Sequence, residues 1–195
     1  NDVDLFPIYD NTFQNTLGVG YYNEWERGIG IKAIDCRLNV YNSTFNNLWY
    51  GIKIDNTLQF HPAMIDRNNF NDCDISVRFS NMNHGIISRC TTNVADRWSI
   101  TGPGGSTYFG RTRGFELENC PNYFVEDNRI LAVSTDPENA DYGIIAKDNG
   151  VLNNQIYRNY HYGFRFAGIS AQGINGDFMV DEGLRILCNK FEDDI

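Results

Sequence analysis

The stretch Val125-Glu-Asp-Asn-Arg-Ile130 is one copy of a hexamer that recurs along the whole chain. Its form is an aliphatic residue, two variable residues, Asn, one variable residue and then Phe or Ile. The other copies are Ile8–Phe13, Val40–Phe45, Ile65–Phe70, Ile87–Thr92, Val151–Ile156 and Ile186–Phe191. Ser43 and Cys90 replace the Asn in two of them. A repeat of this kind indicates a repeat architecture, so it is interpreted before any single residue is assigned chemistry.

A second short element precedes most of the hexamers. It consists of Gly followed by two apolar residues that flank one variable residue. Its copies begin at Gly28, Gly51, Gly114, Gly143, Gly163 and Gly183, and Asp74 takes the equivalent place in one repeat. This alternation predicts a short strand with one buried face. We expect the Gly to serve a corner that needs positive φ, and the repeated Asn to adopt the left-handed conformation at its own corner.

The spacing of the hexamers limits the fold. They start at residues 8, 40, 65, 87, 125, 151 and 186, so the shortest units hold 22 to 26 residues. Such a unit has room for two or three short strands but not for an ordinary helix, and it can bury its apolar face only against stacked copies. The sequence therefore predicts an all-β fold, a single-stranded right-handed parallel β-helix of about seven coils. Its Asn residues would bond from coil to coil. A β-propeller blade needs about 40 to 50 residues, so a propeller is the weaker alternative, as is a β-sandwich.

Both repeats resemble those of right-handed parallel β-helix proteins of the pectin-lyase-like superfamily, over roughly residues 8 to 191. More closely, the chain looks like the β-helix regions of large exported bacterial surface proteins. That group includes adhesins, polysaccharide-active enzymes and phage tailspikes. The resemblance implies a secreted or cell-surface location and a polysaccharide or a surface protein as the partner. We expect residues 1–195 to form one β-helix domain of a longer protein, because the chain begins in polar sequence and stops just after a repeat.

Composition argues against several classes of partner. The formal net charge is -9 and the Lys and Arg residues are scattered, which disfavours nucleic-acid binding. No apolar run is long enough for a membrane span.

The five Cys follow no CxxC spacing, so we predict no zinc site and expect them to fill small apolar spaces. No cofactor is predicted. Asp177, Asp181 and Glu182 could supply calcium ligands, but nothing fixes their spacing.

Three long segments separate a hexamer from the next strand, namely Gln14–Arg27, Asn93–Arg113 and Leu131–Tyr142. If the repeats are in register, all three leave the coil at one corner and line one flank, where insertions often bind ligands. A further long segment, Ala167–Glu182, leaves from a different point. Aromatic rings beside charged groups are typical of sugar-binding grooves, so we predict ligand contacts from Tyr22, Trp25, Trp98, Tyr108 and Phe109. Alternatively, these rings only pin their loops onto the coil.

The search for catalytic motifs finds little. His84-Gly85 matches one motif of the β-helix polygalacturonases, but their Asn-Thr-Asp and Asp-Asp motifs do not precede it, and Arg185-Ile186-Leu187 lacks the Lys of their Arg-Ile-Lys. No pectate-lyase signature is present. Carboxylates are numerous, but no pair stands out for glycoside hydrolysis, and we expect most of them to solvate outer faces. His61, His84 and His161 lack metal-ligand neighbours and are interpreted as solvent-facing turn residues.

Two hypotheses follow. The first is a non-catalytic module that displays loops for glycan or protein binding, as an adhesin does. The alternative is a polysaccharide lyase or glycoside hydrolase of the β-helix type, including the tailspike type. For that alternative the candidate catalytic residues are Glu24, Asp96, Arg111 and Arg113.

Overall fold

A computed structural model describes residues 7–16, 27–58, 61–95, 99–101, 107–109, 112–132, 141–177 and 182–192. For 99–101 and 107–109 only the backbone is described. Every element whose bounds fall within these ranges is a β-strand. These described residues include no helix that is long and apolar enough to cross a membrane. The chain is therefore all-β in the part that the structure describes, as the sequence predicts.

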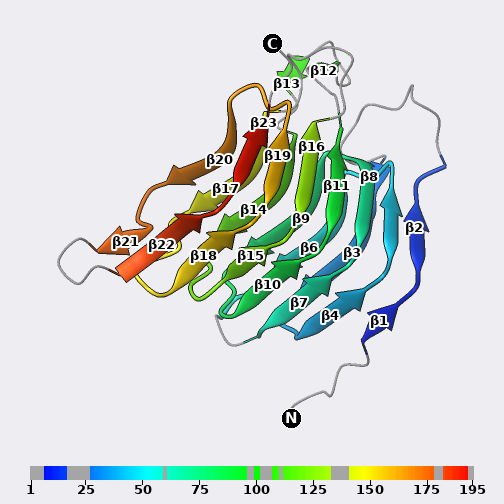
Figure 1. Cartoon of the computed structure of the whole chain (residues 1–195). Helices are drawn as coiled ribbons and strands as arrows, with labels where there is room; N and C mark the ends of the chain where they lie inside the picture. Colours follow the sequence, from blue (N-terminus) through cyan, green and yellow to red (C-terminus); the bar gives the residue numbers. More distant parts are fainter. Residues whose placement is uncertain are drawn as a thin grey trace.

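Three long parallel sheets make up the molecule (Figure 1). Sheet A contains β1 (Ile8–Tyr9), β4 (Leu38–Tyr41), β7 (Ala63–Asp66), β10 (Gly85–Ser88), β15 (Phe124–Glu126), β18 (Asn154–Tyr157) and β22 (Glu182–Leu187), with β21 (Gly176–Asp177) antiparallel to β22 at its end. Sheet B contains β2 (Thr12–Gln14), β5 (Thr44–Asn46), β8 (Asn69–Cys73), β11 (Thr91–Val94), β16 (Arg129–Ala132), β19 (Tyr160–Tyr162) and β23 (Lys190–Glu192). Sheet C contains β3 (Ile29–Ile34), β6 (Tyr50–Asp55), β9 (Ile75–Ser80), β14 (Arg113–Glu118), β17 (Tyr142–Lys147) and β20 (Ala167–Gln172).

The chain passes from sheet A to sheet B to sheet C and then begins the cycle again. Apart from β21, each strand of the three sheets pairs in parallel with its equivalent in the adjacent cycle or cycles, and we call one such cycle a coil. Long stacked parallel sheets of this kind are consistent with a β-helix solenoid. A separate antiparallel pair, β12 (Ser99–Thr101) and β13 (Thr107–Phe109), stands outside the three sheets.

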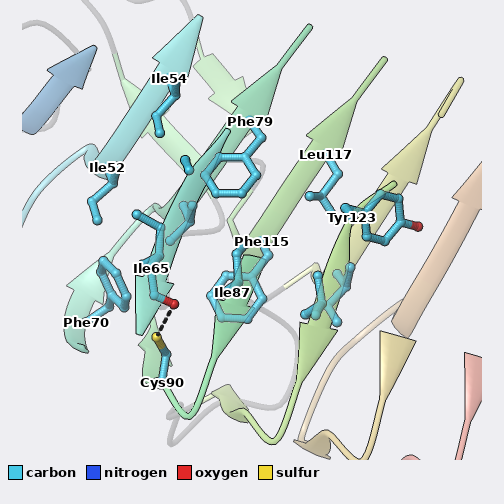
Figure 2. Close-up of a cluster of buried hydrophobic side chains, with 14 of the residues drawn as sticks. Ile52, Ile54, Ile65, Phe70, Phe79, Ile87, Cys90, Phe115, Leu117 and Tyr123 are labelled. Atoms are coloured by element: carbon cyan, nitrogen blue, oxygen red, sulfur yellow. Dashed lines mark hydrogen bonds between the residues drawn. The ribbon is translucent and has the colours of Figure 1, made fainter. Parts of the chain in front are cut away.

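The core is built from columns of equivalent side chains. In sheet A the column Val40, Ile65, Ile87, Val125 and Ile156 is fully buried. In sheet B the Phe column stacks ring on ring, with centroids 4.8 Å apart for Phe13 and Phe45 and 4.9 Å for Phe45 and Phe70. Figure 2 shows Ile52, Phe79 and Phe115 of sheet C packed into one cluster with Ile65 and Ile87 of sheet A.

The predicted Asn ladder is present at the corner between sheets A and B. The side chain of Asn128 accepts a bond from the Cys90 amide (2.9 Å) and donates to the Ile87 carbonyl (3.0 Å) and to the Asn159 side chain (2.9 Å). Asn159 repeats this pattern with Asn189. The left-handed conformation, however, belongs to the residue before each ladder residue, so our assignment of positive φ to the Asn was wrong. The left-handed residues are Asp10, Asn42, Arg67, Arg89, Asp127, Arg158 and Cys188.

One hexamer was assigned to the wrong residues. The register pairs Ile156 with Val125 and with Ile186, so the sixth copy is Ile156-Tyr-Arg-Asn-Tyr-His161 and not Val151–Ile156. Its ladder residue is Asn159, and Asn154 instead accepts a longer bond from the Tyr123 amide. The prediction failed because His161 takes the place of the Phe or Ile that defines the motif. His161 is consequently buried, and our interpretation of it as solvent-facing was wrong.

The Gly column of sheet C also needs correction. The register places Gly30, Gly51, Ser76, Gly114, Gly143 and Gly168 side by side, so Gly28, Asp74, Gly163 and Gly183 were misassigned. The expected positive φ is present at Gly28, Gly163 and Gly183, but the five Gly of the column itself do not have it. Each is required by close approach instead: a Cβ on Gly51 would lie 2.6 Å from the Phe70 ring, and one on Gly114 would lie 2.7 Å from Ile130. The column therefore makes room for the ring column of sheet B in the next coil.

Candidate functional site

The three long segments share the corner between sheets B and C. They connect β2 to β3, β11 to β14 and β16 to β17. Most of their residues lie outside the described part of the chain, and β12 and β13 come from the second segment. The predicted fourth segment, Ala167–Glu182, begins instead with β20 of sheet C and continues to β21, because the strand expected at Gly163–Phe166 lies at Ala167–Gln172.

Most predicted site residues cannot be placed. Tyr22, Glu24, Trp25, Asp96, Trp98 and Arg111 lie outside the described residues. Tyr108 and Phe109 belong to β13, where only the backbone is described. Arg113 is the exception: it opens β14, and its amide donates to the Asp74 carbonyl (2.8 Å). The site is therefore built outward from Arg113.

Arg113 belongs to a charged cluster on the outer face of sheet C, formed by Arg78, Arg113, Glu116, Glu118 and Lys147. One guanidinium nitrogen of Arg113 lies 2.9 Å from a Glu116 carboxylate oxygen. Arg78 lies 3.1 Å from Glu118, which also accepts a bond from the Lys147 ammonium at 2.7 Å. Neighbouring β9, β14 and β17 bring these groups together in register. We call this group the sheet C cluster.

The sheet C cluster is more buried than an ordinary outer face. The side chains of Arg113 and Glu116 are only 14% and 12% exposed. Arg78 Nε and Arg113 Nε lack a hydrogen-bond partner although they are shielded from solvent. Buried polar groups without hydrogen bonds are costly, so these atoms are available to a ligand or to ordered water.

Electrostatics favour the ionised form of Glu118 in this cluster. The bond from Lys147 lowers the pKa of Glu118 against the opposing effect of burial, and Arg78 adds to the lowering. Burial alone would lower the pKa of Arg78, but the nearby Glu116 carboxylate and the Tyr50 hydroxyl raise it overall. A general acid for glycoside hydrolysis needs a raised carboxyl pKa. Glu118 has the opposite shift.

A column of cations runs along the same face. The register places Lys32, Lys53 and Arg78 side by side on β3, β6 and β9. Adjacent strands lie about 4.8 Å apart, and like charges directly opposite one another are destabilising. Lys53 is partly neutralised by Asp55 at 3.1 Å, while Lys32 is exposed. Arg78 is paired with Glu118, so Lys32 supplies the exposed positive charge of this cation column in a chain of net charge -9.

The sequence contained a signal for this column that our prediction missed. In the corrected register, Lys32, Lys53 and Glu116 occupy the variable position of the Gly-Φ-x-Φ element. Because that position faces outward, the residues that occupy it in successive repeats lie side by side and determine the charge of one continuous surface. Our prediction considered only the insertions as binding surface and not this outward-facing position.

Several expected acidic surface residues are buried and paired. Asp66 accepts bonds from Ser88 (2.8 Å) and from both Nε (2.8 Å) and a terminal nitrogen (2.7 Å) of Arg89. Asp74 lies 2.8 Å from the buried Arg27. Our expectation that these carboxylates solvate outer faces was wrong for Asp66, Asp74 and Glu116. They stabilise contacts between coils.

The described residues contain no group of His, Cys, Asp and Glu suited to a metal ion. Asp177 and Glu182 are opposite one another in the β21–β22 pair, and Asp181 lies outside the described part. All five Cys are free. Burial raises the pKa of Cys73, Cys90 and Cys120 to about 12, so these three are unreactive fillers, as expected.

No family model, curated protein or solved structure matches this chain.

Proposed function

We propose that the chain is a non-catalytic β-helix module of an exported bacterial surface protein, and that it binds an acidic polysaccharide. The ligand would lie along the outer face of sheet C, beside the insertions of the B–C corner. The cation column of Lys32, Lys53 and Arg78 carries this proposal, because it places three cationic side chains in register on an otherwise acidic protein and leaves Lys32 exposed.

The proposal includes the finer architecture. We take the three stacked sheets as a right-handed, single-stranded parallel β-helix of about seven coils, with its long insertions on one flank. The Asn ladder and the Gly and Phe columns support a relation to the pectin-lyase-like superfamily. The shared B–C corner of the three segments supports a single flank.

The ion pairs support binding over catalysis. In the sheet C cluster, both Glu116 and Glu118 are matched with cations, and the pKa of Glu118 is lowered. A carboxylate in such a pair holds its neighbours in place but is a poor proton donor. The exposed Lys32 remains to attract the carboxylates of a ligand.

A polysaccharide lyase or hydrolase is the second candidate. The observation in its favour is the shielded Arg113–Glu116 pair beside Glu118, in which Arg113 Nε has no hydrogen-bond partner. Perturbed, shielded charge clusters are concentrated at catalytic sites. In this alternative Glu24, Asp96 and Arg111 from the insertions would complete the catalytic set.

The test is a binding and turnover assay with polygalacturonate, alginate and a neutral glucan. We expect the two acidic polymers to bind, the glucan not to bind, and the Lys32→Ala/Lys53→Ala double variant to lose at least tenfold in affinity. Lys190→Ala, on the outer face of sheet B, is the matched control and should bind normally. New reducing ends or unsaturated products at an ordinary enzymatic rate would favour the lyase or hydrolase. Equal binding by the double variant would rule out the cation column as the site.

A further inference from the structure

His161 occupies a position that the repeat reserves for an apolar ring. It lies in β19, between Ile130 of β16 and Phe191 of β23 in the ring column of sheet B. Its side chain is stacked on Phe191, with centroids 4.9 Å apart and ring planes at 15°, and it meets Phe164 edge-on at 6.4 Å. Only 1% of the residue is exposed. An ionisable ring thus substitutes for Phe at the joint between the last two coils.

Neither imidazole nitrogen has a hydrogen-bond partner. A Cβ on Gly143 would lie 2.6 Å from Nδ1, so this nitrogen faces the backbone of sheet C. The charged side chains of the elements packed around the ring, and of the connection from β19 to β20, are Arg129, Lys147, Arg165, Lys190 and Glu192, and β20 has none. None of them bonds to the imidazole. The titratable neighbours on β19 itself are Tyr160 and Tyr162, and Glu192 is bound to Tyr160 and Lys190.

A pocket of about 210 Å³ lies beside the imidazole. It is lined by His161, Tyr162, Gly163, Phe164, Gly168, Phe191 and Glu192. Phe191, which stacks on the imidazole, is more than half exposed in this structure. Water therefore has a short path to the ring once β23 moves.

We propose that His161 is an acid-sensitive latch that holds the C-terminal coil, β22 and β23, on the preceding coil. When the imidazole is neutral, it packs as a ring of the column. Once protonated, it carries a charge and two N–H donors at a position where neither nitrogen has a hydrogen-bond partner, which is unfavourable in an apolar interior. Stacking on Phe191 offsets this only partly, because a cation over a Phe ring gains little beside the cost of losing water. The charge is relieved when β23 separates and the pocket fills with water.

The direction of the pH effect follows from proton linkage. Burial lowers the pKa of His161 from 6.5 to about 4. The closed coil therefore binds fewer protons than the opened coil between these values. Stability of the joint is complete above pH 6.5 and is lost as the pH falls towards 4. For such a shift, opening at pH 5 is favoured about 30-fold relative to pH 7.5.

Hydrogen exchange at pH 7.5 and pH 5.0, corrected for intrinsic rates, tests the latch in the whole chain. We expect amides of β19 and β23 to lose protection about 30-fold at pH 5.0 in the wild type, while β5 and β8 do not change. His161→Phe restores the consensus of the column and should abolish the loss. His84→Asn, at an exposed turn with positive φ, should preserve it.

Two results would overturn the latch: an unchanged β23 at pH 5.0 in the wild type, or the same loss in His161→Phe. If the variant fails to fold, titration of the wild-type imidazole by NMR decides in its place. A pKa below 5 supports the latch, and a pKa near 6.5 excludes it.

Discussion

The two corners of sheet B follow different rules. At the A–B corner every coil uses one left-handed residue followed by one ladder residue, as in Asp127 and Asn128. At the B–C corner the connection varies from residue 74 alone, between β8 and β9, to residues 95–112, between β11 and β14. The A–B corner has no room for insertions, because each ladder residue bonds to its neighbours on both sides. Near the B–C corner the side chains of Asn46, Asn71 and Asn93 also bond in a row, at 2.9 Å each, yet this corner carries the insertions.

The A–B corner therefore maintains the fold, whereas the B–C corner carries the segments beside which we propose the ligand binds. Hydrogen bonds that repeat from coil to coil fix the register at the A–B corner, so a change there should affect the whole stack. Individual ion pairs and close contacts stabilise the B–C corner, so a change there should act locally. Four pairs of variants can break or sharpen this contrast.

The largest effect is expected for Asn128→Ala. This change removes the acceptor of the Cys90 amide and the donors to the Ile87 carbonyl and Asn159, all in a buried position. Each buried group left without a partner costs about 1–3 kcal/mol, so we expect a loss of about 4 kcal/mol in the free energy of unfolding. Urea denaturation measures it, with Asn153→Ala on an exposed turn as the control. A loss under about 1 kcal/mol would mean that the ladder does not hold the register.

At the B–C corner, Arg27→Met should cost about 3 kcal/mol. Arg27 is buried, and its guanidinium lies 2.8 Å from Asp74 and 3.5 Å from the exposed Asp72. Met keeps most of the apolar stem but leaves the buried Asp74 carboxylate without this cation. Thermal unfolding of the variant should show the loss, and Asp72→Asn should show almost none. Equal effects for the two changes would indicate general electrostatics and not a specific buried pair.

Gly51→Ala should cost about 2 kcal/mol by overpacking. Its new methyl group would lie 2.6 Å from both the Phe70 ring and the Ser76 carbonyl oxygen. The molecule itself supplies the matched control, because Ser76 and Thr92 replace Gly and Phe in the same columns and hydrogen-bond to each other. Gly51→Ser combined with Phe70→Thr should therefore be more stable than Gly51→Ser alone. If Phe70→Thr does not restore stability to the Gly51→Ser variant, the Gly column is not coupled to the ring column.

The contrast between the two corners also explains which features of the structure could be predicted from the sequence. The ladder and the parallel sheets were predictable because Asn and the apolar columns repeat with the period of the coil. His161 does not fit the motif, because it is a polar ring at a position that the motif gives to Phe or Ile. As a result the sixth hexamer was assigned to the wrong residues, and the burial of His161 was not predicted. The true role of the Gly column depends on contacts between a strand and the next coil, as between Gly51 and Phe70, which spacing does not reveal. The sheet C cluster was missed because Arg78, Glu116 and Lys147 meet only through register.

The smallest effects concern two ion pairs of the A–B corner that share one geometry. Arg89 binds Asp66 through two nitrogens, and Arg158 binds Asp127 in the same way, at 2.6 Å for both contacts. Asp66 is 3% exposed in its side chain, whereas Asp127 is 38% exposed. We expect Asp66→Asn to cost about 1–2 kcal/mol, because its carboxylate is shielded and also binds Ser88.

Asp127→Asn should have no measurable effect at physiological salt, because solvent screens exposed pairs. The bond from Arg158 lowers the pKa of Asp127, so any contribution is present above the usual carboxyl range and is lost as the pH falls through the folded value. Denaturant unfolding at pH 7 in low and high salt would reveal such a contribution as a difference confined to low salt. If Asp127→Asn proves as costly as Asp66→Asn, then bidentate geometry, and not burial, determines the strength of these pairs.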